Sequence, residues 1–388
     1  MRSRTFQLPA GPLGLLAEAS REAGRAPDFV LAFLPPDEHL PDSLAALAAA
    51  WPESLRFGCE AVTQFADDAL TTRGSLQLFW FDDPAHHAEV QVVAGTHAEP
   101  PSAERIGDLA RHLATADGAL LIADGLRFPA ERFLDDLRRA LQARLSSKPA
   151  GGSASPLPWM AGGLASQREP VTRAGARVFL QEQIFPAACL AVTLHGVEMH
   201  VEVVRGWTPA SPVYTVTRAA GQVLHEIDGE SATEWYRRFF TIDGQLAPMP
   251  DAANRFPLIV EGPAPERQGL YRSLRFFDDP PGAVTFWGSI EKGDRVRLGM
   301  GNERSLVQTA SRLPRREPPQ AAILYSCVGR EMVLGERAGN EVAAIHEALG
   351  GAALSGFFTF GEIGPTPHGG LSFYNHTAIL VLLHEEGT

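Results

Sequence analysis

Short apolar runs alternate with segments of helical periodicity along the first 150 residues. Four runs are short, apolar and closed by turn-forming or polar residues, as buried strands are: 28–36, 55–62, 75–81 and 118–125. Three segments between or after them have helical spacing or composition: 43–51, 102–116 and 129–145. The alternation predicts an α/β chain (mixed α+β) in which mixed sheets are flanked by helices.

Two later segments predict connections of different kinds. Residues 146–167 are rich in glycine, serine and proline, which predicts a loop inside one domain. Over 190–204 apolar residues alternate on both sides of Gly196. This pattern predicts a β-hairpin with Gly196 in its turn.

A change of pattern near 220–230 predicts a domain boundary. Strand-like sequence there gives way to a helix that starts at a capping box formed by Ser231 and Glu234. We therefore expect two packed domains, residues 1–222 and 223–388. The remaining elements predicted are strands at 323–327, 357–360 and 376–383, a helix at 340–349 with Asn340 as N-cap, and a loop at 361–370.

Composition narrows the classes of partner and location. The 388-residue chain has a net charge of −12 and a pI near 5.5, which disfavours nucleic acid and anionic membrane surfaces as partners. No apolar run reaches the ~20 residues that span a bilayer, and no signal peptide is evident, so a cytoplasmic location is expected. Three cysteines without CxxC spacing predict reduced thiols and no metal site.

Polar residues beside the C-terminal strands predict a ligand site. Arg330, Glu341, Glu362 and Asn375 accompany apolar segments, where an unpaired charge is costly unless a ligand or partner satisfies it. Arg330 suits a carboxylate or phosphate ligand, or else an internal ion pair with Glu341 or Glu362. Glu362 lies among glycines in the predicted loop, which favours a place at the floor of a pocket.

Cys327 and His346 leave alternatives open. Cys327 follows a strand three residues before Arg330; a nearby cation would lower its pKa and favour a nucleophile, whereas burial would leave an inert thiol. His346 lies four residues after Val342 on the apolar stripe of its helix. Its imidazole could bind a haem iron or hydrogen-bond within the core.

Several segments together resemble the FIST family of sensory proteins. They are LRFGCEAV (55–62), MAGGLAS (160–166), YSCVGR (325–330), SGFFTFGEIGP (355–365) and YNHT (374–377). The resemblance implies a FIST N-like domain over 1–222 and a FIST C-like domain over 223–388. In YNHT, His376 stands where glutamine is frequent in the family.

The resemblance also implies a function. FIST proteins bind small ligands and pass a signal to a partner such as a histidine kinase or a cyclic-di-GMP enzyme, so this chain is expected to act in trans and not as an enzyme. A subset of similar stand-alone proteins binds haem and senses nitric oxide, for which His346 or His376 would be the iron ligand. The alternatives are an enzyme that uses Cys327 or Glu362, and an interaction module without a ligand.

Overall fold

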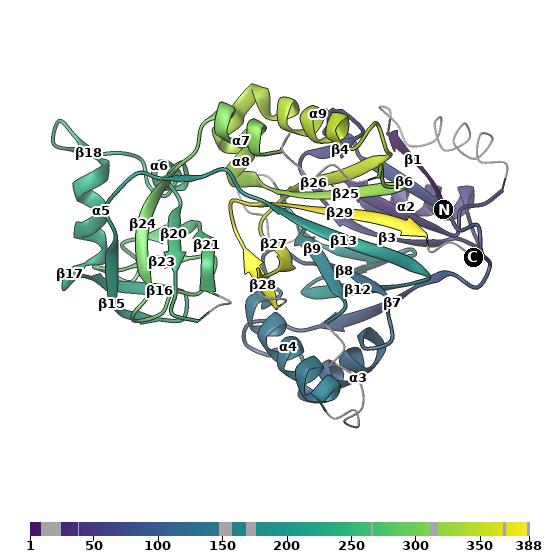
Figure 1. Ribbon diagram of the computed structural model, residues 1–388, viewed down its shortest axis with the longest axis horizontal. Helices are drawn as coiled ribbons and strands as arrows, with labels where there is room; N and C mark the ends of the chain where they lie inside the picture. Colours follow the sequence, from purple (N-terminus) through teal and green to yellow (C-terminus); the bar gives the residue numbers. More distant parts are fainter. Residues whose placement is uncertain are drawn as a thin grey trace.

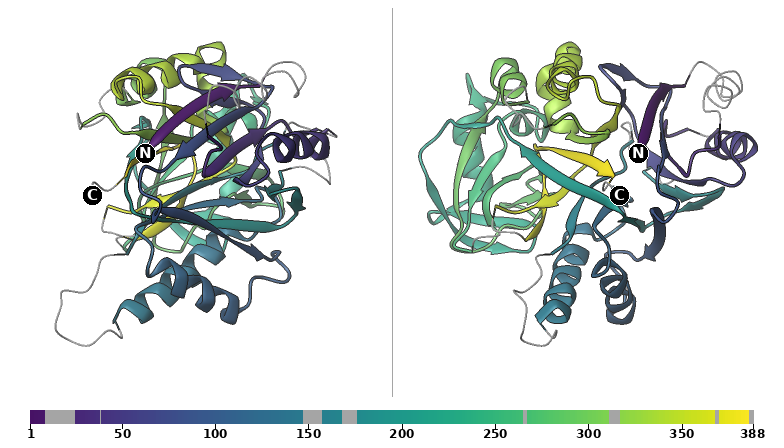
Figure 2. Two further views of the ribbon diagram at one scale, coloured as in Figure 1. Left: turned by 90° about the vertical axis from the view of Figure 1, so that its right-hand side faces the viewer. Right: turned by 45° about the vertical axis from the view of Figure 1, so that its right-hand side comes forward.

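The computed structural model describes residues 1–8, 25–37, 39–146, 157–167, 176–264, 267–310, 317–367 and 370–385. Within them, a body of three six-stranded sheets and their helices is joined to a smaller β-rich lobe, at the left of Figure 1. The lobe runs from β14 (Thr208–Pro209) to β24 (Arg295–Met300). Figure 2 shows the same division from two further sides.

Sheet 1 contains the N-terminal strands of the body. Its order is β1 (Arg2–Gln7), β6 (Ser75–Trp80), β2 (Phe29–Leu34), β3 (Leu55–Glu60), β10 (Val178–Leu180) and β11 (Gln183–Phe185). Helix α2 (Leu40–Ala50) covers one face through Leu44 and Leu47, which pack with Val30 and Leu78. The alternate residues of β2, among them Leu31, point to the opposite face, as the two-residue period of a strand requires.

Sheet 2 combines strands that are distant in the sequence. Its order is β28 (Leu371–Tyr374), β27 (Glu362–Pro365), β9 (Trp159–Leu164), β8 (Gly118–Ala123), β12 (Ala188–His195) and β7 (His87–Ala94). Helices α3 (Ala103–Leu113) and α4 (Ala130–Ser146) pack on one face through leucines and phenylalanines that contact Leu121 and Phe373. Ser102 caps α3 by accepting a hydrogen bond from the Arg105 amide.

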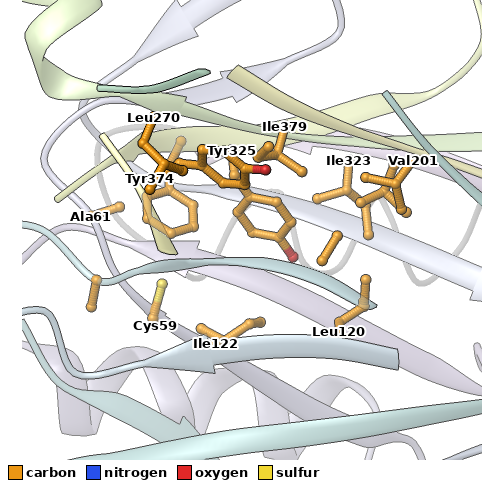
Figure 3. Close-up of a cluster of buried hydrophobic side chains, with 14 of the residues drawn as sticks. Cys59, Ala61, Leu120, Ile122, Val201, Leu270, Ile323, Tyr325, Tyr374 and Ile379 are labelled. Carbon is orange, nitrogen blue, oxygen red and sulfur yellow. The ribbon is translucent and has the colours of Figure 1, made fainter. Parts of the chain in front are cut away.

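Sheet 3 also joins the two halves of the chain. Its order is β13 (Val197–Val204), β29 (Ala378–Glu385), β25 (Ala321–Cys327), β26 (Leu354–Thr359), β4 (Gln64–Ala66) and β5 (Ala69–Thr71). Helices α7 (Glu303–Ala310), α8 (Val328–Leu334) and α9 (Ala338–Ala348) lie over it (Figure 1). The inner faces of all three sheets meet in one apolar core, where Cys59 of β3 and Ile122 of β8 lie near Tyr325 of β25 (Figure 3).

Among its described residues, the lobe is a nine-stranded antiparallel sheet with two helices. Its main path is β21 (Gln268–Arg272), β20 (Leu258–Glu261), β24, β15 (Tyr214–Ala220), β16 (Val223–Ile227), β23 (Val284–Phe286) and β22 (Leu274–Phe277), with β14 and β17 (Glu230–Ser231) at its sides. Helices α5 (Ala232–Phe240) and α6 (Asp251–Asn254) and the small ribbon of β18 (Thr241–Ile242) and β19 (Gln245–Leu246) complete it. The predicted capping box begins α5, because the Ser231 hydroxyl accepts from the Glu234 amide.

The structure confirms the predicted fold class, mixed sheets flanked by helices. The boundary predicted between residues 222 and 223 falls in the turn between β15 and β16, inside the lobe. Strands from both sides of that point share sheets 2 and 3, since β27 pairs with β9 and β26 pairs with β4. The division of the chain at 222 and 223 stays a prediction.

The predicted hairpin at 190–204 is wrong. β12 pairs with β7 on one edge and β8 on the other, so neither edge is free for β13. β13 instead pairs with β29 in sheet 3. Gly196, with φ of +74°, turns the chain from sheet 2 to sheet 3, a conformation that favours glycine.

Three further local predictions need correction. The predicted loop at 361–370 contains strand β27, of which Glu362 and Ile363 pair with both β9 and β28; residues 368 and 369 lie outside the described part. Strand β9 lies within the segment predicted as the loop 146–167, of which 147–156 lie outside the described part. Helix α9 begins at Ala338 without a side-chain cap, so Asn340 is inside the helix.

Candidate functional site

The carboxyl ends of three parallel strand pairs lie close together in the body. The pairs are β2–β3 in sheet 1, β8–β9 in sheet 2 and β25–β26 in sheet 3. Ser166, just after β9, donates its amide to the Glu60 carbonyl at 3.1 Å and its hydroxyl to the Phe358 carbonyl at 2.7 Å. These bonds connect the ends of β9, β3 and β26. Ligands of α/β proteins commonly bind at the carboxyl ends of strands.

Glu362 is a fully buried carboxyl group beside these strand ends. Its Oε2 atom accepts hydrogen bonds from the Thr377 amide at 3.0 Å and the Thr377 hydroxyl at 2.8 Å. Its Oε1 atom has no hydrogen-bond partner among the described residues. Burial raises the pKa of Glu362 to about 8, so the group is mostly protonated at neutral pH and can donate a hydrogen bond.

The turn between β28 and β29 carries two more incompletely bonded side chains. Asn375 accepts a hydrogen bond from the Ser273 amide at 3.3 Å, but its Nδ2 atom has no partner among the described residues. His376 is fully buried, and both of its ring nitrogens lack partners within the same part of the chain. Burial, with the nearby Arg330 charge, lowers the pKa of His376 to about 3, so the imidazole is neutral.

The backbone of this turn is held in a sparsely populated conformation. His376 has φ of +58°, a region that non-glycine residues rarely adopt. The Trp207 indole nitrogen donates to the His376 carbonyl at 2.7 Å, and the two rings meet edge to face at 5.0 Å. Such strain persists only where the surroundings fix it, and it is common at functional sites.

Gly329 is needed to accommodate the imidazole. A Cβ atom at Gly329 would lie 2.4 Å from His376 Nδ1, which is inside van der Waals contact. We expect Gly329→Ala to lower the free energy of unfolding by about 1–3 kcal/mol, as overpacking of a core does. Gly107→Ala in α3 is the matched control, because its Cβ would meet no atom within 4 Å. Equal urea midpoints for the two variants would contradict this packing.

Arg330 and Glu341 form a buried ion pair. Both side chains are fully buried; Arg330 Nε lies 3.0 Å from Glu341 Oε1, and Nη2 donates to the same oxygen. Ser326 also donates to the Glu341 carboxylate, at 3.3 Å. Of the partners that the sequence allowed for Arg330, the structure shows an ion pair with Glu341. The Arg330 charge also lies near Glu362 and His376.

Cys327 caps α8 and lies beside the Glu362 carboxyl group. Its Sγ atom accepts a hydrogen bond from the Gly329 amide at 3.4 Å. Burial, followed by the Glu362 charge, raises the pKa of the thiol well above its ordinary value. The nearby cation therefore does not lower the pKa, because Glu341 pairs with Arg330 and desolvation dominates. Burial and the raised pKa of the thiol favour the inert one of the two forms that the sequence allowed.

The surroundings of the two histidines do not suit a haem iron. The His376 ring packs against Trp207 on one side and Gly329 on another, where an added Cβ atom would lie 2.4 Å from Nδ1. His346 is half-buried in the last turn of α9. Neither histidine lines the cavity at the seam between the body and the lobe. No group of three or more histidine, cysteine, aspartate or glutamate side chains in the described residues could hold a metal ion.

The structure brings together most of the predicted site residues and adds others. We use the name Glu362 cluster for Cys327, Glu362, Asn375, His376 and Thr377. Arg330 and Glu341 lie next to it, whereas His346 contributes to none of its described contacts. The sequence pattern did not single out Thr377, Ser166 or the Tyr325 hydroxyl, which is also buried without a partner in the described residues. Their common signal is a polar group at or near a strand end.

Two protein-family models match most of this mixed-sheet chain. A FIST N domain model matches residues 28–230, and a FIST C domain model matches residues 232–365. The chain belongs to the FIST family, whose domains mark sensors of signal transduction.

Two curated relatives are themselves uncharacterized. One, from Mycobacterium bovis, is 28% identical over 227 residues, which are 55% of this chain and 58% of that protein. Another, from Mycobacterium tuberculosis, is 27% identical over 224 residues, or 54% and 57% of the two chains. The chain thus spans less than two thirds of the length of these relatives. None of its described helices has the length and apolar character needed to cross a bilayer.

Proposed function

We propose that this FIST protein is a cytoplasmic sensor that binds a small molecule at the Glu362 cluster. One observation carries the proposal: three fully buried side chains, two in the turn at 375–377 and one bonded to Thr377 of that turn, have polar atoms without partners in the described part of the chain. These are Glu362 Oε1, Asn375 Nδ2 and both ring nitrogens of His376. Each unsatisfied buried polar group costs about 1–3 kcal/mol, which a ligand that hydrogen-bonds them would recover.

The protonation states define the chemistry of the ligand. Protonated Glu362 and the Asn375 amide offer hydrogen-bond donors, while neutral His376 offers one donor and one acceptor. A small polar molecule with both donors and acceptors is therefore favoured. A cationic ligand would instead displace the Glu362 proton, and its affinity would rise with pH. A haem-based mechanism is not part of the proposal, because neither histidine has suitable surroundings.

The contacts of the cluster suggest how a signal leaves it. The turn at 375–377 touches both the segment that enters the lobe and the lobe itself: Trp207, just before β14, bonds to His376, and Ser273, between β21 and β22, bonds to Asn375. Arg330 also donates to the Arg205 carbonyl at 3.4 Å. Because the cluster is fully buried, ligand entry must displace this turn, and the displacement would shift the lobe. A partner such as a histidine kinase or a cyclic-di-GMP enzyme would then read that shift in trans.

A thermal-shift screen with small polar molecules tests the proposal. Ligands that raise the melting temperature of the wild type are expected to lose most of that effect on Asn375→Leu, which removes the unpaired donor. The control is Asn254→Leu, at a half-buried asparagine of the lobe whose side chain bonds to the Leu274 backbone. Equal ligand-induced shifts for the wild type and Asn375→Leu would overturn the proposed site.

The enzyme alternative has weaker support. The Cys327 thiol has a raised pKa, and its neighbour Glu362 also keeps its proton, so the pair supplies neither a thiolate nor a base at neutral pH. We therefore propose a binding role, and not a catalytic one, for both residues.

A further inference from the structure

A cavity of about 250 Å³ lies at the seam between the body and the lobe. Its body side is formed by His97, by residues of the segment 125–132, which leads into α4, and by Leu164, Phe360 and Phe373. Its lobe side is formed by Gln222, Arg275 and Trp287. In Figure 1 this seam lies where α4 and β28 approach the lobe. The cavity contains no member of the Glu362 cluster.

Arg275 supplies an uncompensated positive charge to this cavity. Its guanidinium group makes no hydrogen bond or ion pair within the described residues; its contacts are with the rings of Trp287, 4.3 Å away, and Phe276, 4.9 Å away. The side chain is half-buried, and burial lowers its pKa. A partly desolvated arginine with free donors favours an anion, and its planar fork matches a carboxylate.

Aromatic rings form the apolar part of the cavity. Trp287 and Phe360 are stacked with an interplanar angle of 22° and ring centroids 6.3 Å apart. Leu164 and Phe373 are buried side chains that also line it. A flat apolar group is the natural occupant of such walls, because aromatic pairs prefer offset-stacked or edge-to-face contact.

The acidic residue of the lining is already neutralised. Glu131 is the acid among the described lining residues, and its carboxylate accepts from Arg272 at 3.2 Å and from the Ser289 amide at 2.8 Å and hydroxyl at 2.8 Å. It has little capacity left for an ammonium group. The cavity thus favours simple carboxylates over amino acids.

We propose that the seam cavity binds a small aryl carboxylate, with its carboxylate on Arg275 and its ring beside Trp287 and Phe360. The site is separate from the Glu362 cluster and goes beyond the sensor function proposed above. It joins residues of the FIST N match to residues of the FIST C match, so an occupant would hold the lobe against the body. The volume of about 250 Å³ lies just below the usual range of ligand pockets, about 300–1,000 Å³, which suits a single ring.

Titration with phenylacetate tests the proposal, with Trp fluorescence and calorimetry as readouts. Phenylacetamide, which has the same shape without the charge, and phenylalanine, which adds an ammonium group, serve as comparison ligands. We expect phenylacetate to bind the wild type at least tenfold more tightly than either. Arg275→Gln should lose at least tenfold in phenylacetate affinity.

Two control variants show whether phenylacetate binds at the seam cavity itself. Arg132→Gln removes a second arginine of the lining, one that is largely exposed and lies 3.9 Å from Asp136, and should retain wild-type affinity. Glu362→Gln should also retain it, so failure of the sensor site and failure of this site are distinguishable. Absence of phenylacetate binding at millimolar concentration, equal binding of phenylacetamide, or wild-type affinity in Arg275→Gln would overturn the proposal.

Discussion

Arg330→Met is expected to lower the free energy of unfolding by about 3–5 kcal/mol, the usual cost of breaking one side of a buried ion pair. The change leaves the Glu341 carboxylate fully buried, with the Ser326 hydroxyl as its one remaining hydrogen-bond donor among the described residues. Methionine has a similar length to the arginine stem, so loss of packing contributes less than loss of the charge. Urea denaturation followed by circular dichroism measures the effect.

A surface pair and a double variant serve as controls for this prediction. Arg238→Met removes a half-exposed arginine, 2.8 Å from Glu230, and should cost about 0–1 kcal/mol. The double variant Arg330→Met and Glu341→Leu should recover much of the lost stability, because no unpaired charge then remains buried. A single Arg330→Met variant no less stable than Arg238→Met would show that the pair is unimportant to the fold.

Glu362→Gln is expected to make the protein more stable at alkaline pH and to change its pH dependence. The folded pKa of about 8 lies above the ordinary value of 4.5, so the unfolded chain loses the proton first as pH rises. The contribution of Glu362 to stability is therefore fully present below pH 4.5 and is lost as pH rises toward 8. Glutamine keeps an acceptor for Thr377 and does not ionise.

A pH series of unfolding midpoints measures this difference. The gap in unfolding free energy between Glu362→Gln and the wild type should grow by up to about 1.4 kcal/mol per pH unit within that window. Glu347→Gln, at an exposed position in α9, should follow the wild type at every pH. His376 acts in the opposite direction, since its folded pKa of about 3 lies below 6.5 and its contribution is lost as pH falls. Parallel curves for Glu362→Gln and the wild type would contradict a protonated Glu362.

Local sequence signals predicted many elements of the fold. The apolar run of β2 and the capping box of α5 are complete within a few residues, so composition and spacing are sufficient to identify them. The relation of β12 to β13 could not be predicted in this way. It depends on β7 and β8 occupying both edges of β12, a property of distant pairing. Strand β27 was also missed, because its glycine and proline residues are typical of a loop. Pairing with the distant strands β9 and β28 stabilises it.

Several residues of the candidate site could be named from the sequence, but their arrangement in space could not. Polar residues beside apolar strands identified Arg330, Glu362 and Asn375, because burial of such groups needs a compensating partner. The sequence could not show that Glu341 forms the ion pair with Arg330, because this pairing depends on the placement of α9. Nor could it show that one Glu362 oxygen lacks a partner among the described residues, because this depends on the turn at 375–377. The seam cavity was not predicted, because Arg275 and Trp287 meet Phe360 only in the folded chain.

The most direct test of the account is the infrared carbonyl band of a protonated carboxyl group, recorded at neutral pH with and without a ligand found by the thermal-shift screen. We predict that the wild type shows a band that Glu362→Gln lacks, and that the ligand shifts or abolishes this band by bonding Glu362 or taking its proton. A band that is equal in both proteins, or that the ligand leaves unchanged, would contradict the claim that Glu362 is the protonated centre of the sensing site.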